Sequence, residues 1–480
     1  MAEVIPHWLS KRAELAPDQT AIELADGVVY TFQDLMETSQ SFARKLRSLG
    51  IQKHTKVGIL SANQLDMVAA IHALTYLGAV GVLLNTRLTD RELNEQLHDA
   101  GVSLILGQER QSGLTAETYT FAAIWELPEK QTDLQHELDL DDAFTIIYTS
   151  GTTGTPKGVV HTYGNHWWSA IGSMLNLGLQ PQDKWLAVLP FFHVSGLSIL
   201  LRSVIYGIPV YLMEHYDKQH VHDAIMTKNI TIVSVVTNMV RDLLTLLGES
   251  RYPDTLRCML LGGGPAPKAL LETAKTKHMP IFQSYGMTET ASQIVTLSPA
   301  DALEKLGSSG KPLFPAQLQI DAPPQNVGEI FVKGPMVTKG YFNREQASQK
   351  AIQNGWLATG DLGYMDEDGF LYVVDRRKDL IISGGENIYP TEIESVLALL
   401  TGIQEAGVIG RPDEKWGQVP VAFVVLRDSS VTAEAIEAFL RQHLAGYKVP
   451  QAIRFLHELP RNASGKLERY QLAGYLNSGG

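Results

Sequence analysis

The sequence predicts an α/β protein with a large N-terminal domain of mainly parallel sheets with helices and a small C-terminal α+β domain. The first observation is that short apolar runs alternate with helical patterns between about residues 57 and 285. Buried parallel strands are continuous apolar runs, and their alternation with helices is typical of right-handed βαβ units. The second is a change near Leu313 to short, glycine-punctuated strands, and the third is a basic, glycine-rich turn after Asp375. We therefore expect domains at 1–375, with a β subdomain at about 313–375, and at 376–480.

Hydrophobic patterning predicts the elements in order. Continuous apolar runs predict strands at 57–60, 80–84, 103–106, 144–148, 185–189, 209–213, 230–236 and 258–261. Helical patterns predict helices at 65–77, 90–99, 218–228 and 238–247. Short β-rich runs bounded by glycine predict strands of the β subdomain at 328–334 and 369–375. The C-terminal domain is expected to hold helices at 391–400 and 433–444 and strands near 408 and at 419–426 and 452–456, enough chain for a small core.

Composition limits the classes of function. Of the 480 residues, 52 are Asp or Glu and 40 are Lys or Arg, which gives a formal net charge of −12. Because such a surface repels phosphate backbones, nucleic acid is not expected as a partner. Cys258 is the only cysteine, so an internal disulfide and a cysteine-based zinc site are excluded, and a reducing compartment is favoured. The sequence has no signal-peptide pattern and no apolar stretch of membrane-spanning length, so a cytoplasmic protein is expected.

The clearest motif is the segment Tyr148-Thr-Ser-Gly-Thr-Thr-Gly-Thr-Pro-Lys-Gly-Val159. It is expected to follow a buried strand and to precede a helix. Its glycines allow several backbone N–H groups to point at one anion, its hydroxyls add donors, and Lys157 adds a positive charge. The alternative, a flexible linker, fits poorly between a buried strand and a helix. The sequence therefore predicts a phosphate-binding loop, although Gly158 after Lys157 excludes the Walker A pattern.

This loop and four later segments, in the same order, resemble the adenylate-forming superfamily of acyl- and aryl-CoA ligases. The four segments are Ser284-Tyr-Gly-Met-Thr-Glu-Thr290, Ala358-Thr-Gly-Asp361, Asp375-Arg376 followed by Lys378-Asp, and Pro460-Arg-Asn-Ala-Ser-Gly-Lys466. The resemblance covers essentially the whole chain. It implies an AMP-forming acid–thiol ligase that uses ATP, Mg²⁺ and coenzyme A: the acid and ATP give an acyl-adenylate and pyrophosphate, and CoA then displaces AMP. The different class of function left open is an ATP-binding module that adenylates nothing.

The resemblance assigns an ATP and AMP site. Its residues are Thr149, Ser150, Gly151, Thr152, Thr153, Gly154, Lys157, Ser284, Tyr285, Gly286, Asp361 and Arg376. The catalytic candidates are Lys466, Thr288, Glu289 and His193, and the Mg²⁺ candidates are Glu289 and Thr152. These residue types suit the chemistry, because Mg²⁺ takes carboxylates together with phosphate oxygens, an ionised aspartate accepts from ribose hydroxyls, and a lysine stabilises developing negative charge.

The resemblance also implies that the C-terminal domain rotates about Asp375. One orientation would bring Lys466 to the phosphates, and the other would bring a CoA site made of Ser383, Gly384, Gly385 and Trp416. For Trp416, packing on the small domain is an equally weighted alternative. Some superfamily members carry a lysine at the position of Ile382, so any role of that lysine is absent here.

The acyl substrate is expected to contact His193, Ser195, Arg202, Gly262, Gly263 and Ser292. Arg202 lies in an otherwise apolar helical segment, where a cation is unfavourable unless it is paired. Either it is structural, paired with an acidic neighbour or reaching solvent, or it is the counter-ion of a second carboxylate on the substrate. An aromatic keto diacid fits the second reading and is the acid we expect, with another aryl or medium- to long-chain acid as the alternative.

Two further expectations complete the sequence reading. His215, His220 and His222 lie close together, but without further ligand patterns a solvated helix face is favoured over a metal site. The expected partners are the acid, ATP and CoA, with no integral membrane segment, and the oligomeric state stays open, a homo-oligomer included.

Overall fold

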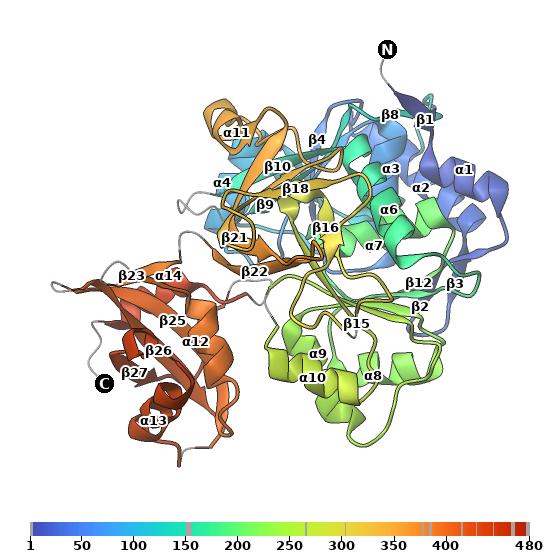
Figure 1. Cartoon of the computed structure of the whole chain (residues 1–480). Coiled ribbons are helices and arrows are strands. Elements are labelled where there is room, and N and C mark those ends of the chain that lie inside the picture. Colours follow the sequence, from blue (N-terminus) through green and yellow to red (C-terminus); the bar gives the residue numbers. More distant parts are fainter. Residues whose placement is uncertain are drawn as a thin grey trace.

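The computed structural model describes residues 3–149, 156–264, 266–302, 304–376, 379–383, 386–413, 416–428, 430–444, 446–461 and 466–476, with the backbone only at 376, 386 and 387. A large body holds the elements up to β22, and a smaller lobe beside it, drawn in orange to red, holds the elements from β23 onward (Figure 1).

The first sheet of the large body carries the phosphate-loop segment. Its order is β10-β9-β5-β4-β6-β7, and every pairing is parallel except that of β10 with β9. The strands are β4 (Lys56–Leu60), β5 (Val80–Leu83), β6 (Leu104–Gly107), β7 (Glu117–Thr120), β9 (Ala143–Thr149) and β10 (Lys157–Thr162). Helix α3 (Leu65–Leu77) joins β4 to β5 and is buried along nearly its whole length, which explains why its apolar residues occur on all sides. Helix α4 (Asp90–Ala100) joins β5 to β6 and begins at a capping box formed by Thr89 and Glu92.

The second sheet has nine strands in the order β17-β16-β15-β14-β13-β11-β12-β2-β3. The pairings from β15 to β2 are parallel, and the outer ones are antiparallel. The strands are β2 (Thr20–Leu24), β3 (Val29–Thr31), β11 (Trp185–Ala187), β12 (Val210–Leu212), β13 (Ile232–Val235), β14 (Cys258–Leu261), β15 (Ile281–Met287), β16 (Ser292–Thr296) and β17 (Lys311–Pro312). A separate pair joins β1 (Val4–Pro6) to β8 (Glu137–Asp139).

Helices complete the large body. They are α1 (Trp8–Leu15), α2 (Phe32–Ser48), α5 (Phe121–Trp125), α6 (Tyr163–Leu177), α7 (Val194–Tyr206), α8 (Lys218–Thr227), α9 (Thr237–Leu247) and α10 (Lys268–Thr276). The largest core cluster contains apolar residues of α3 beside the first sheet and of α7 beside the second, so the two sheets share one core. None of the helices in the described ranges is long and apolar enough to cross a bilayer.

The β subdomain and the C-terminal lobe follow the predicted change of pattern. The subdomain is an antiparallel sheet of β18 (Gln317–Ile320), β19 (Gly328–Lys333), β20 (Ile352–Gln353), β21 (Trp356–Met365) and β22 (Leu371–Arg376), with α11 (Glu345–Ala351). The lobe contains β23 (Ile381–Ser383), β24 (Glu386–Ile388), β25 (Ile403–Asp413), β26 (Gly417–Leu426), β27 (Ala452–Phe455), α12 (Pro390–Leu397), α13 (Ala433–His443) and α14 (Arg469–Leu472), and it has its own apolar core. The predicted fold class is therefore confirmed, and the domain boundary at residue 375 stays a prediction.

Several predicted ends were wrong, and so was one predicted element. The predicted strands 185–189 and 230–236 are Trp185–Ala187 and Ile232–Val235, and the predicted helix 391–400 ends at Leu397. The strands were predicted too long because apolar, buried residues such as Val188 continue beyond the last ladder pairing. The segment after the phosphate loop is a strand and not a helix: β10 runs back along β9, and α6 begins only at Tyr163. The loop thus joins two antiparallel strands, and its predicted position before a helix N-terminus is corrected.

Candidate active site

Strands β9 and β10 bring the two ends of the phosphate-loop segment together. Thr149 lies opposite Lys157 in the ladder, so the chain leaves and re-enters the sheet at one point. The Lys157 Nζ lies 5.0 Å from the centre of the Tyr341 ring, a cation–π contact. The loop residues assigned to ATP, Mg²⁺ or both lie outside the described residues: Ser150, Gly151, Thr152, Thr153 and Gly154.

The turn between β15 and β16 holds the second motif. A short 3₁₀ helix, η1 (Thr288–Thr290), carries Thr288 and Glu289. Gly286 allows the two strands to approach, because a Cβ there would lie 2.2 Å from the backbone oxygen of Ser292. The Tyr285 hydroxyl donates to Asp361 Oδ2 at 2.8 Å, so the residues assigned to adenine and to ribose are in contact. In the β21–β22 ladder Asp361 lies opposite Arg376, which brings the second ribose candidate to the same place by its backbone.

Glu289 has a partner that sequence reasoning missed. Its carboxylate is buried, and the Tyr341 hydroxyl donates to Oε1 at 3.0 Å. Burial and the negative charge of Glu289 raise the pKa of Tyr341, so the phenol keeps its proton and remains a donor. Tyr341 lies in the segment that follows β19, and it is in contact with both Lys157 and Glu289. Nothing in the local sequence marks this tyrosine, since the contact depends on three distant segments.

The lysine of the C-terminal lobe lies near the start of α7. His193 is the N-cap residue of that helix, and burial, followed by the positive charges of Lys466 and Arg87, lowers its pKa to about 4. Lys466 is therefore close enough to disfavour the protonated form of His193, and His193 is neutral at pH 7. Its Nε2 atom is buried and has no hydrogen-bond partner within the described part of the chain. Ser195, two residues further on, is exposed.

Arg202 lies inside the core on α7, with a residue exposure of 1%. Its Nη2 donates to Gln293 Oε1 at 3.0 Å and contacts Ser169 Oγ at 3.4 Å, and its guanidinium lies 5.6 Å from the centre of the Trp185 ring. Within the described ranges no carboxylate pairs with it, and its Nε has no partner. Both structural alternatives that the sequence left open, a neighbouring acidic residue and a side chain reaching solvent, are therefore absent from the described residues.

A chain of neutral polar groups leads away from this cation. Gln293 Oε1 also accepts from Ser292 Oγ at 2.8 Å, and Gln293 Nε2 donates to Ser173 Oγ at 2.9 Å. Ser292, an acyl-site candidate, is thus linked to Arg202 through one amide. Sequence reasoning missed Gln293, although it lies only three residues after the quoted motif, because a neutral amide carries no signal of pairing with a distant arginine.

The remaining acyl-site candidates lie at the end of β14. Gly262 and Gly263 follow Leu261, whose carbonyl accepts from Ser284 Oγ at 3.0 Å. A Cβ at Gly262 would lie 3.1 Å from that hydroxyl oxygen, and Gly263 has a φ of 85°, which favours glycine. This turn therefore lies directly beside the first residue of the second motif.

Two CoA candidates are brought together in the C-terminal lobe. Ser383 at the end of β23 pairs with Gly417 at the start of β26, and Trp416 precedes Gly417. The Trp416 residue is 45% exposed, so it does not form part of the lobe's core in this arrangement. Gly384 and Gly385 lie outside the described residues. Asp375, the hinge candidate, is buried at the end of β22, and its Oδ2 accepts from the backbone N–H of Thr391 at 3.0 Å.

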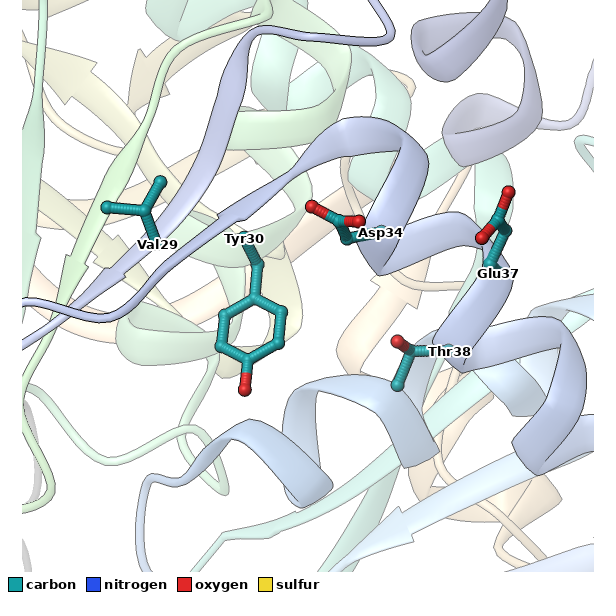
Figure 2. Close-up of a pocket in the computed structure, with 5 residues that line it drawn as sticks. All are labelled: Val29, Tyr30, Asp34, Glu37 and Thr38. Carbon is teal, nitrogen blue, oxygen red and sulfur yellow. The ribbon is translucent and has the colours of Figure 1, made fainter.

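Two other features do not belong to this site. A surface hollow of about 310 Å³ is lined by side chains of β3 and α2: Val29, Tyr30, Asp34, Glu37 and Thr38 (Figure 2). It shares no residue with the candidates above, and its Asp34 is used to cap α2. In the histidine group, the His222 Nδ1 lies 3.0 Å from the Tyr252 hydroxyl, and the backbone N–H of His220 donates to Oδ1 of Asp217, the N-cap residue of α8. The described residues contain no group of three or more His, Cys, Asp or Glu side chains placed to hold a metal ion.

Comparison with known proteins decides the family. The model of the AMP-binding enzyme family matches residues 9–342, and that of the AMP-binding enzyme C-terminal domain matches residues 392–466. The chain belongs to the AMP-binding enzyme family. This agrees with the five motifs and confirms the resemblance to adenylate-forming ligases.

Relatives with the same architecture are known over the full chain. A protein of Oceanobacillus iheyensis named 2-succinylbenzoate–CoA ligase is 55% identical over 479 residues, which cover 98% of this chain and 100% of that protein. The o-succinylbenzoate CoA synthetase (MenE) of Bacillus subtilis, solved with the acyl-adenylate intermediate OSB-AMP, has a TM-score of 0.94 and 46% identity, with 98% of each chain covered. The same enzyme in complex with ATP and a magnesium ion gives the same TM-score and identity, with 98% of this chain and 100% of that chain covered.

Proposed function

We propose that this chain is an AMP-forming ligase that joins 2-succinylbenzoate to coenzyme A. In the first step a substrate carboxylate oxygen attacks the α-phosphorus of ATP, and the bond from that phosphorus to the pyrophosphate oxygen breaks. In the second step the CoA thiolate attacks the acyl carbon, and AMP leaves with the bonding electron pair. The names of the full-length relatives support both steps.

Arg202 is the observation that carries the choice of acid. A guanidinium in the core without a carboxylate is strongly unfavourable unless the bound state supplies one. 2-Succinylbenzoate has two carboxylates, of which one reacts and one stays an anion, and the second is the group that Arg202 would pair with. A fatty acid has no second anion to offer. The neutral partners of Arg202, Gln293 and Ser169, leave its charge uncompensated, which favours a diacid.

His193 is suited to orient the reacting carboxylate. A carboxylic acid is already ionised at pH 7, so no base is needed. Because the pKa of His193 is lowered to about 4, the ring is neutral and offers a hydrogen bond from its buried Nε2 without adding charge. Lys466, close to this ring, would then supply the positive charge that stabilises the oxygens of the transition state.

The residues of the second motif fit an ATP-bound Mg²⁺. The ion binds one or two carboxylates together with phosphate oxygens, and Glu289 offers a buried carboxylate held by Tyr341. When bound, Mg²⁺ neutralises phosphate charge during the first step. Thr288 is placed beside Glu289 on η1, where its hydroxyl would donate to the α-phosphate, and the Tyr285–Asp361 pair would hold the nucleoside.

An acid panel with two half-molecule analogues tests the assignment. 4-Oxo-4-phenylbutanoate lacks the ring carboxylate of 2-succinylbenzoate, and 2-butyrylbenzoate lacks the side-chain carboxylate. The measurements are acid-dependent exchange of pyrophosphate into ATP and CoA-dependent release of AMP. We expect 2-succinylbenzoate to have a kcat/KM at least 100-fold above that of either analogue and of medium-chain fatty acids. A higher kcat/KM for any monocarboxylic acid would refute the proposal.

A further inference from the structure

A buried histidine connects the phosphate-loop hairpin to the second motif. His161 lies on β10 directly opposite Thr145 of β9, and the ladder is irregular immediately after it. Its Nε2 lies 2.6 Å from the backbone oxygen of Thr288, which is 127 residues away in the sequence. His161 itself is fully buried. Neither the phosphate-binding assignments nor the proposed chemistry makes use of this residue.

The hydrogen bonds around His161 have one consistent direction. The oxygen of Thr288 is a carbonyl and only accepts, so the hydrogen of the neutral His161 ring lies on Nε2 and its Nδ1 is an acceptor. The Thr145 hydroxyl, 3.3 Å from Nδ1, is then the donor to it. The same hydroxyl oxygen is 3.0 Å from Nε2 of His166 and accepts from it. A directed chain therefore runs from His166 through Thr145 and His161 to Thr288.

Burial keeps this direction fixed at neutral pH. It lowers the pKa of His161 to about 4, and it lowers that of His166 well below the usual value, with further lowering by the positive charge of Arg202. Both rings are therefore neutral when the protein works near pH 7.

The next carbonyl of η1 is tied to the same hairpin. The backbone N–H of Thr338 donates to the oxygen of Glu289 at 2.8 Å, and the Thr338 hydroxyl donates to the oxygen of Val160 on β10. Two consecutive carbonyls, those of Thr288 and Glu289, are thus anchored on β10, one through His161 and one through Thr338. Because η1 spans only Thr288–Thr290, these bonds fix the whole turn relative to the phosphate-loop hairpin.

We propose that His161 is a positioning residue for adenylation: by holding the Thr288 carbonyl, it sets the place of the Thr288 hydroxyl and of Glu289 relative to the phosphate loop. This rests on the proposed function, in which those two side chains act on ATP. A residue that only fills the core would affect the stability of the fold and nothing else, so the two roles are separable by experiment.

A double-mutant cycle is the test. His161→Leu removes the donor, His161→Gln retains one donor and one acceptor in similar positions, and Thr288→Val removes the hydroxyl that His161 is said to place. His7→Leu is the matched control, because His7 is also buried and bonded to a threonine hydroxyl, Thr75, but contacts none of the site candidates. The rate of acid-dependent pyrophosphate exchange and the Kd of AMP are measured for each variant, per mole of folded protein.

We expect His161→Leu to lower the exchange rate about tenfold in the wild-type background and less than twofold in the Thr288→Val background. His161→Gln should recover most of the loss, and His7→Leu should change neither quantity. Equal losses in both backgrounds, or a leucine variant as active as the wild type, would overturn the proposal. The double-mutant cycle measured on the Kd of AMP needs no turnover, so it decides the role of His161 independently of the substrate. If the wild type fails to exchange pyrophosphate with 2-succinylbenzoate, that result counts against the proposed function alone.

Discussion

Arg202→Leu is expected to remove the preference for a diacid while leaving the fold intact. The wild-type guanidinium is buried among neutral groups, so its removal relieves an uncompensated charge. Replacing buried ionic groups by apolar residues of similar volume is often neutral or stabilising by about 1–4 kcal/mol. Gln293 keeps its bonds to Ser292 and Ser173, so only one of its partners is lost. The free energy of unfolding of the variant should therefore equal or exceed that of the wild type.

The effect on activity has the opposite sign. Without Arg202, the second carboxylate of the acid enters a buried site that holds only neutral groups, and breaking a buried pair costs about 3–5 kcal/mol. Since each 1.36 kcal/mol is about tenfold in rate, kcat/KM for 2-succinylbenzoate should fall by about 10²- to 10⁴-fold. A monocarboxylic analogue that is adenylated at all should lose less than about threefold, or gain, because it never contacts Arg202. The assay is pyrophosphate exchange with both acids, alongside urea unfolding.

Arg257→Leu is the matched control for stability. Arg257 pairs with Asp183 at 2.6 Å, and the Asp183 side chain has no exposed surface. Removing Arg257 therefore leaves a buried carboxylate without its ion-pair partner. This variant should be destabilised by about 3–5 kcal/mol, and its activity should change by the same factor with 2-succinylbenzoate and with the monocarboxylic analogue. Arg202 would be structural, and the reasoning wrong, if Arg202→Leu were destabilised to the same extent or if both acids lost activity equally.

Three further outcomes are expected. Lys466→Ala should abolish pyrophosphate exchange yet retain thioester formation from supplied acyl-adenylate, and equal loss of both half-reactions would contradict its assignment to the first step. Tyr341→Phe removes a hydrogen bond to a buried carboxylate, worth about 1.5–3 kcal/mol, so the Mg²⁺ concentration for half-maximal exchange should rise about tenfold or more, and an unchanged Mg²⁺ titration would contradict the assignment of Glu289. The pKa of His7 is lowered to about 3 and that of His72 to about 4, chiefly by burial, so the unfolded chain binds protons below pH 6.5 that the folded chain does not. The contribution of these two histidines to the free energy of unfolding is complete above pH 6.5 and is lost as the pH falls towards 4, by up to about 1.4 kcal/mol per pH unit for each. Urea unfolding at several pH values measures this loss. A free energy of unfolding that stays constant from pH 7 to 5 would contradict the prediction.

The apolar pattern of the sequence was sufficient to predict the bounds of elements that are uniformly buried. The predicted helix 65–77 and the predicted strand 258–261 agree with the structure at both ends, because a glycine or a polar residue stops the apolar pattern where the element stops. It was insufficient after the phosphate loop, where Lys157–Thr162 is a short strand that reads as the start of the following helix. Six residues carry too little pattern to separate the two states, and the partner strand decides.

The candidate site shows a similar division. Charged residues and glycines with a defined chemistry, such as Glu289 and Lys466, could be proposed from motifs. Neutral partners could not, because Gln293, Tyr341 and His161 matter only through contacts with residues that are 52 to 127 positions away in the sequence. Their residue types are common in structural roles, and only the fold brings them to a cation, a carboxylate or a backbone carbonyl.

The hinge candidate Asp375 lies close to an arginine of the segment that carries Lys466. Arg469, three residues after Lys466, forms an ion pair with Glu394 at 2.6 Å and lies 3.4 Å from Asp379 and 3.9 Å from Asp375. Three carboxylates around one guanidinium give a cluster with a net negative charge. Burial by itself would lower the pKa of Arg469, but the negative charges of Glu394, Asp375 and Asp379 outweigh it, so the pKa of Arg469 is raised. The position of the Lys466 segment is therefore coupled through Arg469 to Asp375. If the chain rotates at Asp375, we expect the Arg469–Glu394 ion pair to move with the segment that carries Lys466, because breaking a largely buried pair is unfavourable.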